Sequence, residues 1–382
     1  MQHARIAIVG GGLSGLYAAA LLEERGIHDY VVLEARGTFG GRIVSWPDAS
    51  RNHDDGTAER SIMGRFDLGA TWYWPAIHPT LQQLVQQLGL ETVQQHEDGQ
   101  MLIERSRAHA PSRVDGFTSA PPALRLAGGM GALVDAIRAR LPADRLVHGR
   151  QVTGLRQHDD RIEGQTDNAL GQAASYHVAH VLLAVPPKLA TSTIEFTPAL
   201  PDVLQRRWQA CGTWMAPHAK YVAVYDAPFW REQGLSGEAR SAVGPMGEIH
   251  DASSNQGDAA LFGFLGVPAQ VRRQTPDAVL LAHCRAQFVR LFGDKAARPK
   301  AEFLKDWAAD PYTAVAGDDN PDLNHPIPPP RSSTEGPWRN RIVGIASEWS
   351  PNFPGYVAGA IEAARLGVEA LCAPNTAASV LH

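Results

Sequence analysis

Three glycines near the start of the chain have the spacing of a phosphate-binding turn. Gly10, Gly12 and Gly15 follow a strand-like run at residues 5–9 and open a predicted helix at residues 13–25. In this pattern the first glycine permits a tight turn, the second lets the backbone approach a phosphate, and the third lets helix and strand pack closely. The helix would also direct the positive end of its dipole at the phosphate. The spacing therefore predicts a site for the pyrophosphate of a dinucleotide.

A carboxylate follows at the distance that ribose recognition requires. Residues 30–33 form a second strand-like run, and Glu34 stands directly after them, about 20 positions beyond Gly15. A glycine-rich turn in an unrelated fold is the alternative interpretation. The flanking strand, the following helix and the placement of Glu34 together favour nucleotide binding.

Composition and charge place the chain among ordinary globular proteins. Its 382 residues suffice for two core-bearing units, and it is 44% hydrophobic and 20% charged. A net charge of −5 gives no argument for a nucleic-acid partner and disfavours an anionic membrane surface. No apolar run is long enough to cross a bilayer, and the first strand begins too early to leave room for a signal peptide. We therefore expect a cytoplasmic protein that binds neither nucleic acid nor membrane.

The three cysteines, Cys211, Cys284 and Cys372, stand far apart in the sequence. An odd number of isolated cysteines is typical of reduced thiols, and the spacing fits neither a disulfide framework nor a metal site. We expect free thiols and no bound metal.

The pattern of apolar residues alternates between helical and strand spacing along the chain. Helical spacing follows Pro79 and recurs at residues 130–141, while residues 177–185, 221–225 and 259–265 read as strands. Loop compositions are found at residues 47–64, 110–122 and 317–340. This mixture predicts an α/β or α+β enzyme, without fixing the order of the strands.

Two segments resemble the flavin-containing amine oxidase family. Just past Glu34 the chain carries Gly40-Gly41-Arg42, where that family places a Gly-Gly-Arg. Near the end, residues 342–345 and 348–357 resemble the strand, loop and helix that close the flavin site in these enzymes. Weaker similarities lie between them, so the resemblance is discontinuous but extends from residue 5 to about residue 370.

The resemblance implies FAD as cofactor. By it, Arg42 contacts the pyrophosphate through its guanidinium group, although a solvated loop arginine is the alternative. Val152, at the end of a short strand, holds the adenine through its backbone. Glu348 faces the ribityl and phosphate region, and a helix beginning near Gly355 directs free N–H groups at the flavin pyrimidine. The full set of predicted cofactor-binding residues is Gly10, Gly12, Leu13, Ser14, Gly15, Glu34, Ala35, Arg36, Gly41, Arg42, Gly69, Ala70, Thr71, Trp72, Val152, Trp307, Glu348, Gly355, Tyr356 and Val357.

The same resemblance implies three catalytic residues. Lys220 matches the lysine that holds a water against flavin N5, and strand alternation places it on one face with Val222 and Val224. The alternative for such a lysine is the solvent-exposed end of the strand. Trp307 resembles the tryptophan beside the flavin. Tyr356 matches one of the two aromatic residues that flank the substrate nitrogen in monoamine oxidases.

The sequence also departs from the family pattern. Counting from Pro311-Tyr312, the cysteine that bonds flavin in mammalian-type enzymes would fall at Ala316, and the second substrate-flanking aromatic at Gly317. These residues predict non-covalent FAD and make a two-tyrosine cage doubtful. Thr71-Trp72 stands where amino-acid oxidases carry a carboxylate-binding arginine, which disfavours an α-amino-acid substrate.

An aromatic run follows, and the segment after it is short. Trp72, Tyr73 and Trp74 cannot all share one face of a strand, so at least one is available to line a substrate pocket. The segment between Trp74 and Arg125 is short for a family in which a helical lid often stands there.

These inferences combine into one prediction. The fold is α/β, with a doubly wound FAD-binding domain interleaved with a smaller, sheet-based substrate domain. The former takes residues 1–75, 125–212 and 338–382, and the latter residues 76–124 and 213–337.

The predicted function is oxidation of a small amine to an imine and then a carbonyl compound, with hydride transfer to FAD and oxygen reduced to peroxide. Three alternatives remain. They are an L-amino-acid oxidase, a desaturase or isomerase of an apolar non-amine substrate with the same fold, and a flavin-binding interaction protein with little turnover. The sequence names neither the amine nor the oligomeric state, and it leaves open an electron acceptor other than oxygen.

Overall fold

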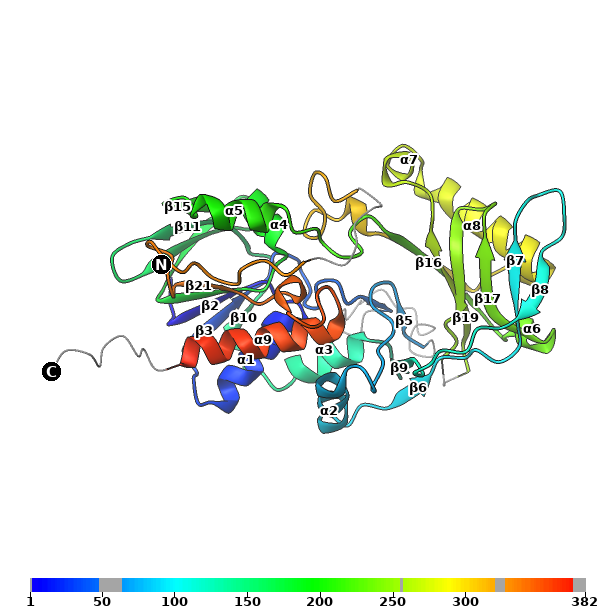
Figure 1. The fold of residues 1–382 in the computed structure, drawn as a ribbon, viewed down its shortest axis with the longest axis horizontal. Helices are drawn as coiled ribbons and strands as arrows, with labels where there is room; N and C mark the ends of the chain where they lie inside the picture. Colours follow the sequence, from blue (N-terminus) through cyan, green and yellow to red (C-terminus); the bar gives the residue numbers. More distant parts are fainter. Residues whose placement is uncertain (1, 48–63, 255–256, 320–326, 374–382) are drawn as a thin grey trace. The chain divides into compact units, whose positions relative to one another are not determined.

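The computed structural model describes residues 2–47, 64–254, 257–319 and 327–373 (Figure 1). The predicted loop at residues 47–64 lies outside the described residues except at its two ends, as does the part of the predicted 317–340 loop at residues 320–326. The chain divides into two compact units. Unit 1 consists of Met1–Gly41, Ala136–Trp214 and Asn324–His382, and unit 2 of Arg42–Asp135 and Met215–Leu323. The assignment of FAD and substrate domains to chain segments stays a prediction.

Unit 1 is built on a five-stranded sheet in the order β10-β3-β2-β14-β21, in which every pairing is parallel. Its strands are β10 (Leu146–Val147), β3 (Tyr30–Leu33), β2 (Ile6–Val9), β14 (His180–Leu183) and β21 (Ile342–Gly344). All residues of β2, β3 and β21 are buried, as expected where both faces of a parallel sheet are covered.

Helices and a second sheet cover the parallel sheet. The helices of unit 1 are α1 (Leu13–Glu24), α4 (Pro187–Thr193), α5 (Asp202–Gln209) and α9 (Val357–Cys372), while α3 (Gly131–Arg138) contains the boundary with unit 2. Helix α9 packs along α1 (Figure 1). The second sheet has the order β1-β13-β12-β11-β15, with strands β1 (Gln2–His3), β13 (Ala173–Val178), β12 (Ile162–Asp167), β11 (Gln151–Gln157) and β15 (Glu195–Thr197).

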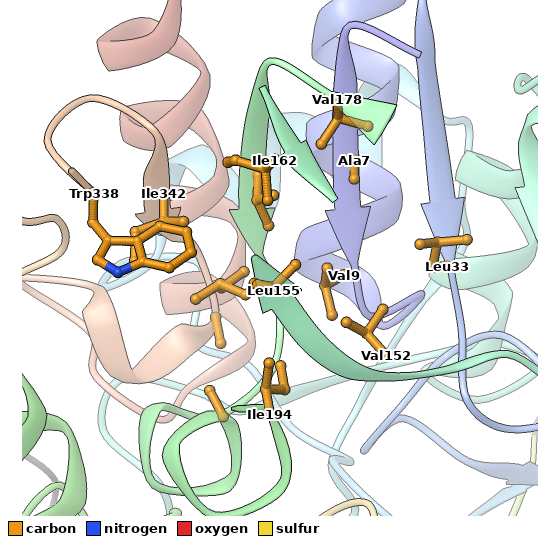
Figure 2. Packing of buried hydrophobic residues seen from close by; sticks show 14 of the residues in the cluster. Ala7, Val9, Leu33, Val152, Leu155, Ile162, Val178, Ile194, Trp338 and Ile342 are labelled. Carbon is orange, nitrogen blue, oxygen red and sulfur yellow. The ribbon is translucent and has the colours of Figure 1, made fainter. Parts of the chain in front are cut away.

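The core of unit 1 lies between its two sheets. Ala7 and Val9 of β2 and Leu33 of β3 share one cluster with Leu155 of β11 and Ile162 of β12 (Figure 2). This packing fixes the parallel sheet, and therefore the ends of its strands, in a rigid frame.

One predicted strand is wrong in its extent. Residues 177–185 read as a single strand, but they belong to β13 and β14, which lie in different sheets. The chain changes sheets at Ala179 and His180, whose N–H groups both donate to the carbonyl oxygen of Arg5, at 3.0 and 3.2 Å respectively. Apolar periodicity does not record such a change of partner, because both strands are buried.

Unit 2 is built on a seven-stranded sheet in the order β20-β16-β19-β18-β17-β7-β8. Its strands are β20 (Ala301–Asp306), β16 (Ala219–Tyr225), β19 (Ala259–Leu265), β18 (Met246–Asp251), β17 (Leu235–Ser241), β7 (Gln100–Glu104) and β8 (Ser112–Asp115). Strand β8 lies within the predicted loop at residues 110–122, so that prediction is wrong. Its largely exposed residues form an edge strand, which carries no core-facing apolar pattern.

The two faces of this sheet pack differently. Tyr221, Ala223 and Tyr225 of β16 face a core that includes helix α8 (Asp277–Phe292), which lies along the sheet (Figure 1). Val222 and Val224 face the opposite cluster, formed with Phe66 and Phe262 among others.

Shorter elements complete unit 2. They are the ribbon of β4 (Ser45–Trp46) with β5 (Phe66–Asp67), the ribbon of β6 (Thr92–Gln94) with β9 (Leu124–Leu126), and helices α2 (Pro79–Gln87), α6 (Phe229–Glu232) and α7 (Ala269–Arg273). None of the helices in the described part of the chain is long and apolar enough to cross a membrane. Cys211, Cys284 and Cys372 carry free thiols.

Candidate functional site

The turn after β2 has the geometry that its glycines predict. Gly10 has a φ of +106°, a backbone conformation that side chains with a Cβ rarely adopt. A Cβ at Gly15 would lie 2.0 Å from the Gly10 carbonyl oxygen, so the close approach of helix and turn requires glycine there. Helix α1 begins at Leu13, and its first intrahelical bond runs from Leu16 N–H to Gly12 O (3.0 Å). The N–H groups before it have no acceptor within the helix, which suits an anion.

Glu34 is buried beside this turn, with 3% of its surface exposed. Its Oε2 accepts the N–H of Gly11 at 2.7 Å, and its Oε1 accepts the N–H of Arg36 at 2.8 Å. Two backbone donors therefore hold the carboxylate at the end of β3. The N–H of Gly40 in turn donates to Gly11 O (2.9 Å), so the segment that leads to Gly41 also lies against the turn.

Val152 is not where the sequence placed it within its strand. It was expected at the end of a short strand, whereas it is the second residue of the seven-residue β11. The short strand is β10, and the loop that joins β10 to β11 pairs with the segment after β3: Arg150 N–H donates to Glu34 O and Gly149 N–H to Arg36 O, both at 2.8 Å. Val152 lies just beyond this loop, as the second residue of β11.

The second predicted segment forms the start of α9. Tyr356 is the residue before the helix, which runs from Val357, so the predicted start is confirmed. Glu348 is fully buried in a 3₁₀ turn (Ser347–Trp349), and Gly355 N–H donates to Ser347 O at 3.2 Å. The first bond to an acceptor at the helix start is Ala360 N–H to Tyr356 O (3.2 Å), so the preceding N–H groups lack acceptors within the helix.

These segments of unit 1 leave the parallel sheet at one edge. The glycine turn follows β2, Glu34 follows β3 and the segment of Glu348 follows β21, and all three strands run parallel through β14. Ligands of open parallel sheets bind outside the carboxyl ends of the strands. The glycine turn, the two helix starts and the buried carboxylate at this edge fit the phosphates and ribose of a dinucleotide.

Lys220 is the centre of a second group of predicted residues, in unit 2. Only 2% of its surface is exposed, so the alternative of a solvent-exposed strand end is wrong. Its Nζ donates hydrogen bonds to Thr71 Oγ1 and to Gly69 O (3.4 Å). Nζ also lies 3.9 Å from the centre of the Phe262 ring, a cation–π distance. The side chain thus turns to the face of Val222 and Val224, as strand alternation predicts.

Burial lowers the pKa of Lys220 to about 7. Desolvation is the largest cause, because a low-dielectric interior disfavours the ammonium form. The negative charge of Asp67 opposes this shift, and the positive charge of Arg125 adds to it. Lys220 therefore changes its protonation state near neutral pH.

Asp67 and Arg125 are functional candidates that the sequence analysis missed. Asp67 Oδ1 accepts hydrogen bonds from Ser45 Oγ and from the N–H of Met130 (2.8 Å), and burial raises the pKa of its carboxyl. Arg125 Nη2 donates to Ser253 O at 2.8 Å, while its buried Nε has no partner among the described residues. Both residues stand inside apolar stretches of sequence, a signal that marks buried charge without revealing which other charges it meets.

Trp307 packs against the segment that holds Lys220. Its Nε1 donates to Leu68 O at 3.1 Å, and a Cβ at Gly69 would lie 3.3 Å from its ring. Lys305 Nζ lies 4.5 Å from the centre of the indole and donates to Asp310 at 2.6 Å. The structure therefore brings Gly69, Thr71, Lys220 and Trp307 together within unit 2.

The aromatic run divides as the strand argument predicts. Trp72 contacts the rings of His250 (4.9 Å between centres) and Phe262 (5.3 Å), so it shares the Phe262 ring with Lys220. Tyr73 is buried and its hydroxyl donates to Gln82 Oε1 at 2.8 Å, and Trp74 lies against His78. Of the three, Trp72 is the one placed with the Lys220 group.

The two positions that depart from the family lie in an exposed turn. Ala316 and Gly317 are exposed, and the N–H of Asp318 donates to Val315 O at 3.0 Å across them. Neither a thiol nor an aromatic ring is available at this turn.

Comparison with known proteins identifies the family. The model of the flavin containing amine oxidoreductase family matches residues 13–124 and 104–372. The chain belongs to this family. That result confirms the predicted family and the predicted enzyme class, an FAD-dependent amine oxidase.

Relatives and solved structures agree with this assignment. The chain is 24% identical over 418 residues to the probable flavin-containing monoamine oxidase A of Dictyostelium discoideum, covering 81% of this chain and 84% of that protein. It is 28% identical over 265 residues to putrescine oxidase of Kocuria rosea, covering 63% of this chain and 51% of that protein.

Solved structures confirm the predicted α/β fold. A putrescine oxidase bound to putrescine has a TM-score of 0.74 at 20% identity, covering 96% of this chain and 98% of that one. Cyclohexylamine oxidase from Brevibacterium oxydans IH-35A has a TM-score of 0.76 at 17% identity, with the same coverage.

Proposed function

We propose that this chain oxidises a small amine to an imine, which water then hydrolyses to a carbonyl compound. The substrate loses a hydride from carbon and a proton from nitrogen, and oxygen takes up the two electrons and two protons as hydrogen peroxide. FAD, when bound, supplies the acceptor for the hydride. Family membership supports the reaction class, and the observation that carries the finer proposal is the buried Lys220 with its pKa lowered to about 7.

The residues of unit 1 would bind and orient the cofactor. The N–H groups at the start of α1 are donors for phosphate, and Glu34 is the acceptor for ribose hydroxyls. The N–H groups at the start of α9 are donors for the flavin pyrimidine, where a helix N-terminus stabilises negative charge by roughly 0.3–2 kcal/mol. Arg36, Arg42, Val152 and Glu348 keep the roles that the family resemblance gives them.

The residues of unit 2 would act nearest to the chemistry. Lys220 would hold a water for flavin N5 through the N–H of Nζ that is not donated to Thr71 or Gly69. Trp307, fixed through its bond to Leu68 O, would limit the space beside a bound flavin. Tyr356 keeps the role beside the substrate nitrogen that the family resemblance gives it. No general base is required if the amine enters uncharged.

The substrate proposed is an amine without an α-carboxylate. An uncharged amine avoids the cost of burying an ammonium group, which an aromatic pocket cannot compensate well. Thr71 and Trp72 offer no cationic partner for a carboxylate.

Flavin would be bound without a covalent link, because Ala316 offers no thiol. Acid precipitation should therefore release the flavin into the supernatant.

Anaerobic mixing of the purified enzyme with matched substrates tests the proposal. Each amine is paired with its α-carboxylated counterpart, and flavin absorbance is followed after mixing. We expect rapid bleaching by at least one amine and a lower kcat/KM for its amino acid. No bleaching by any amine would contradict the proposal and favour a non-amine substrate. A higher kcat/KM for the amino acid would point to an L-amino-acid oxidase, with Arg125 as the candidate cationic partner.

A further inference from the structure

Among the residues that the structure describes, the hydroxyl of Thr71 is the side-chain group that accepts a hydrogen bond from Lys220 Nζ. Thr71 is 7% exposed and Lys220 is 2% exposed, so their hydrogen bond lies in the protein interior. The hydroxyl proton of Thr71 is directed at Gly69 O, 3.4 Å away. That arrangement leaves an oxygen lone pair of Thr71 for a proton of Nζ.

A lysine needs such an anchor to place its nitrogen. Its ammonium is a compact charge on a flexible four-carbon chain with three rotatable donors. Gly69 O accepts one N–H at the long distance of 3.4 Å, and the Phe262 ring attracts the charge without fixing a direction. The bond to Thr71 is the shorter and more directional of these contacts, so it determines where Nζ lies.

The other groups around Lys220 do not fix the direction of its Nζ. Asp67 of β5 accepts hydrogen bonds from Ser45 and Met130, while Arg125 of β9 donates to Ser253 O. Phe262 and Phe264 come from β19 and carry no charge. Lys305 stands opposite Lys220 in the β16–β20 register, but its Nζ donates to Asp310.

We propose that Thr71 is a positioning residue for Lys220: its buried hydroxyl fixes Nζ, and through Nζ the water that Lys220 holds. The inference rests on the proposed function for the role of that water, but the contact itself can be tested without turnover. Because the hydroxyl accepts a hydrogen bond from the ammonium form, its removal favours the neutral amine.

The test compares Thr71→Val, which removes the hydroxyl at nearly constant shape, with Thr71→Ser, which restores it. In holoenzyme with parental flavin content, we expect Thr71→Val to slow the Lys220-dependent step roughly tenfold to a hundredfold. Its pH profile should shift to lower pH, whereas Thr71→Ser should recover most of the rate. In a Lys220→Met background, Thr71→Val should have no further effect, because the group it positions is gone.

Several outcomes would overturn the inference. They are a parental rate and pH profile in Thr71→Val, equal impairment in both variants, an additive effect in the Lys220→Met background, and loss of flavin from Thr71→Val. A readout independent of turnover separates this inference from the proposed function. The ¹⁵Nζ signal absent from Lys220→Met should titrate at lower pH in Thr71→Val than in the parent holoenzyme. If no amine bleaches the flavin while this shift is seen, the proposed function fails and the Thr71–Lys220 contact stands; an unshifted titration overturns the contact itself.

Discussion

The glycine turn of unit 1 and the Lys220 group of unit 2 are built in different ways. The turn uses backbone: Gly10 and Gly15 provide the conformation and the close approach, and backbone N–H groups provide the donors. The Lys220 group uses side chains, whose charges are buried and whose protonation is shifted. Backbone donors do not titrate, so the turn is suited to binding over a wide pH range. A buried amine is suited to chemistry that depends on its protonation state.

The largest effect that this comparison predicts comes from one methyl group in the turn. Gly15→Ala improves intrinsic helix propensity by about 1 kcal/mol, yet the added Cβ would lie 2.0 Å from Gly10 O. We expect the variant to purify without flavin or to fail to fold, because neither backbone segment can move without opening the turn. The control is Gly37→Ala, where no atom lies within 4 Å of the added Cβ. Parental flavin content in Gly15→Ala would show that the turn tolerates a wider approach.

The next largest expected effect is a change in the pH dependence of folding stability when Lys220 is replaced. Its pKa is about 7 in the folded chain against an ordinary value of 10.5, so between these values the unfolded chain carries a proton that the folded chain lacks. The stability of the parent therefore rises with pH through this window, by up to about 1.4 kcal/mol per unit. Lys220→Met removes the titration. Its stability relative to the parent should be highest near pH 7, by on the order of 4 kcal/mol, and should decline toward pH 10.

Denaturant unfolding of both proteins at pH 7 and pH 10 measures this difference. Asp67 should also make the stability of Lys220→Met, relative to the parent, decline as pH rises. Without the positive charge of Lys220, the Asp67 carboxyl is protonated more readily in the folded state than in the parent. Parallel pH curves for parent and variant would mean that Lys220 keeps an ordinary pKa. The contrast between the non-titrating turn of unit 1 and a titrating amine in unit 2 would then no longer hold.

The same substitution should slow the enzyme while leaving the cofactor bound. Removing one positioned group typically costs roughly 10²-fold in rate, and Lys220→Met should slow flavin reduction or its reoxidation by about that factor. The control is Lys295→Met, which removes an exposed lysine of unit 2 paired with an exposed glutamate. Stopped-flow absorbance in the two half-reactions identifies the affected step. If Lys220→Met had the same rates as the parent in both half-reactions, Lys220 would have no catalytic role.

The same contrast explains how much could be read from the sequence. Gly10, Gly12, Gly15 and Glu34 lie in one continuous strand–turn–helix–strand segment, so their spacing alone predicted a turn that the structure confirms. The start of α9 at Val357 was likewise predicted from a local motif. Local backbone geometry is encoded locally, and that is why these elements were predictable.

The surroundings of Lys220 were not predictable in the same way. Strand alternation gave the face on which Lys220 lies, but not its contact with Thr71, about 150 residues earlier in the chain. The opposing charges of Asp67 and Arg125 also come from other strands, so neither received a role. At residues 177–185 two buried strands follow one another, and the pattern of apolar residues predicted them as a single strand. All of these features depend on which distant segments of the chain pair with one another, and that pairing cannot be inferred from a single sequence.

The smallest effect returns to unit 1 and tests whether it acts in binding alone. In Glu34→Gln one side-chain oxygen still accepts a backbone N–H, while the amide nitrogen that replaces the other faces a donor. In the proposed complex Glu34 also accepts a hydrogen bond from a ribose hydroxyl, and loss of this one charge-assisted bond costs about 1.5 kcal/mol. The Kd for FAD should therefore rise roughly tenfold. At saturating FAD the rates of both half-reactions should equal those of the parent, because Glu34 takes no part in the chemistry. Glu24→Gln, which removes the same charge from the exposed end of α1, is the control and should bind FAD like the parent. A slower half-reaction at saturating FAD would show that Glu34 also orients the reactive part of the cofactor, and the separation between a binding unit and a chemical unit would no longer hold.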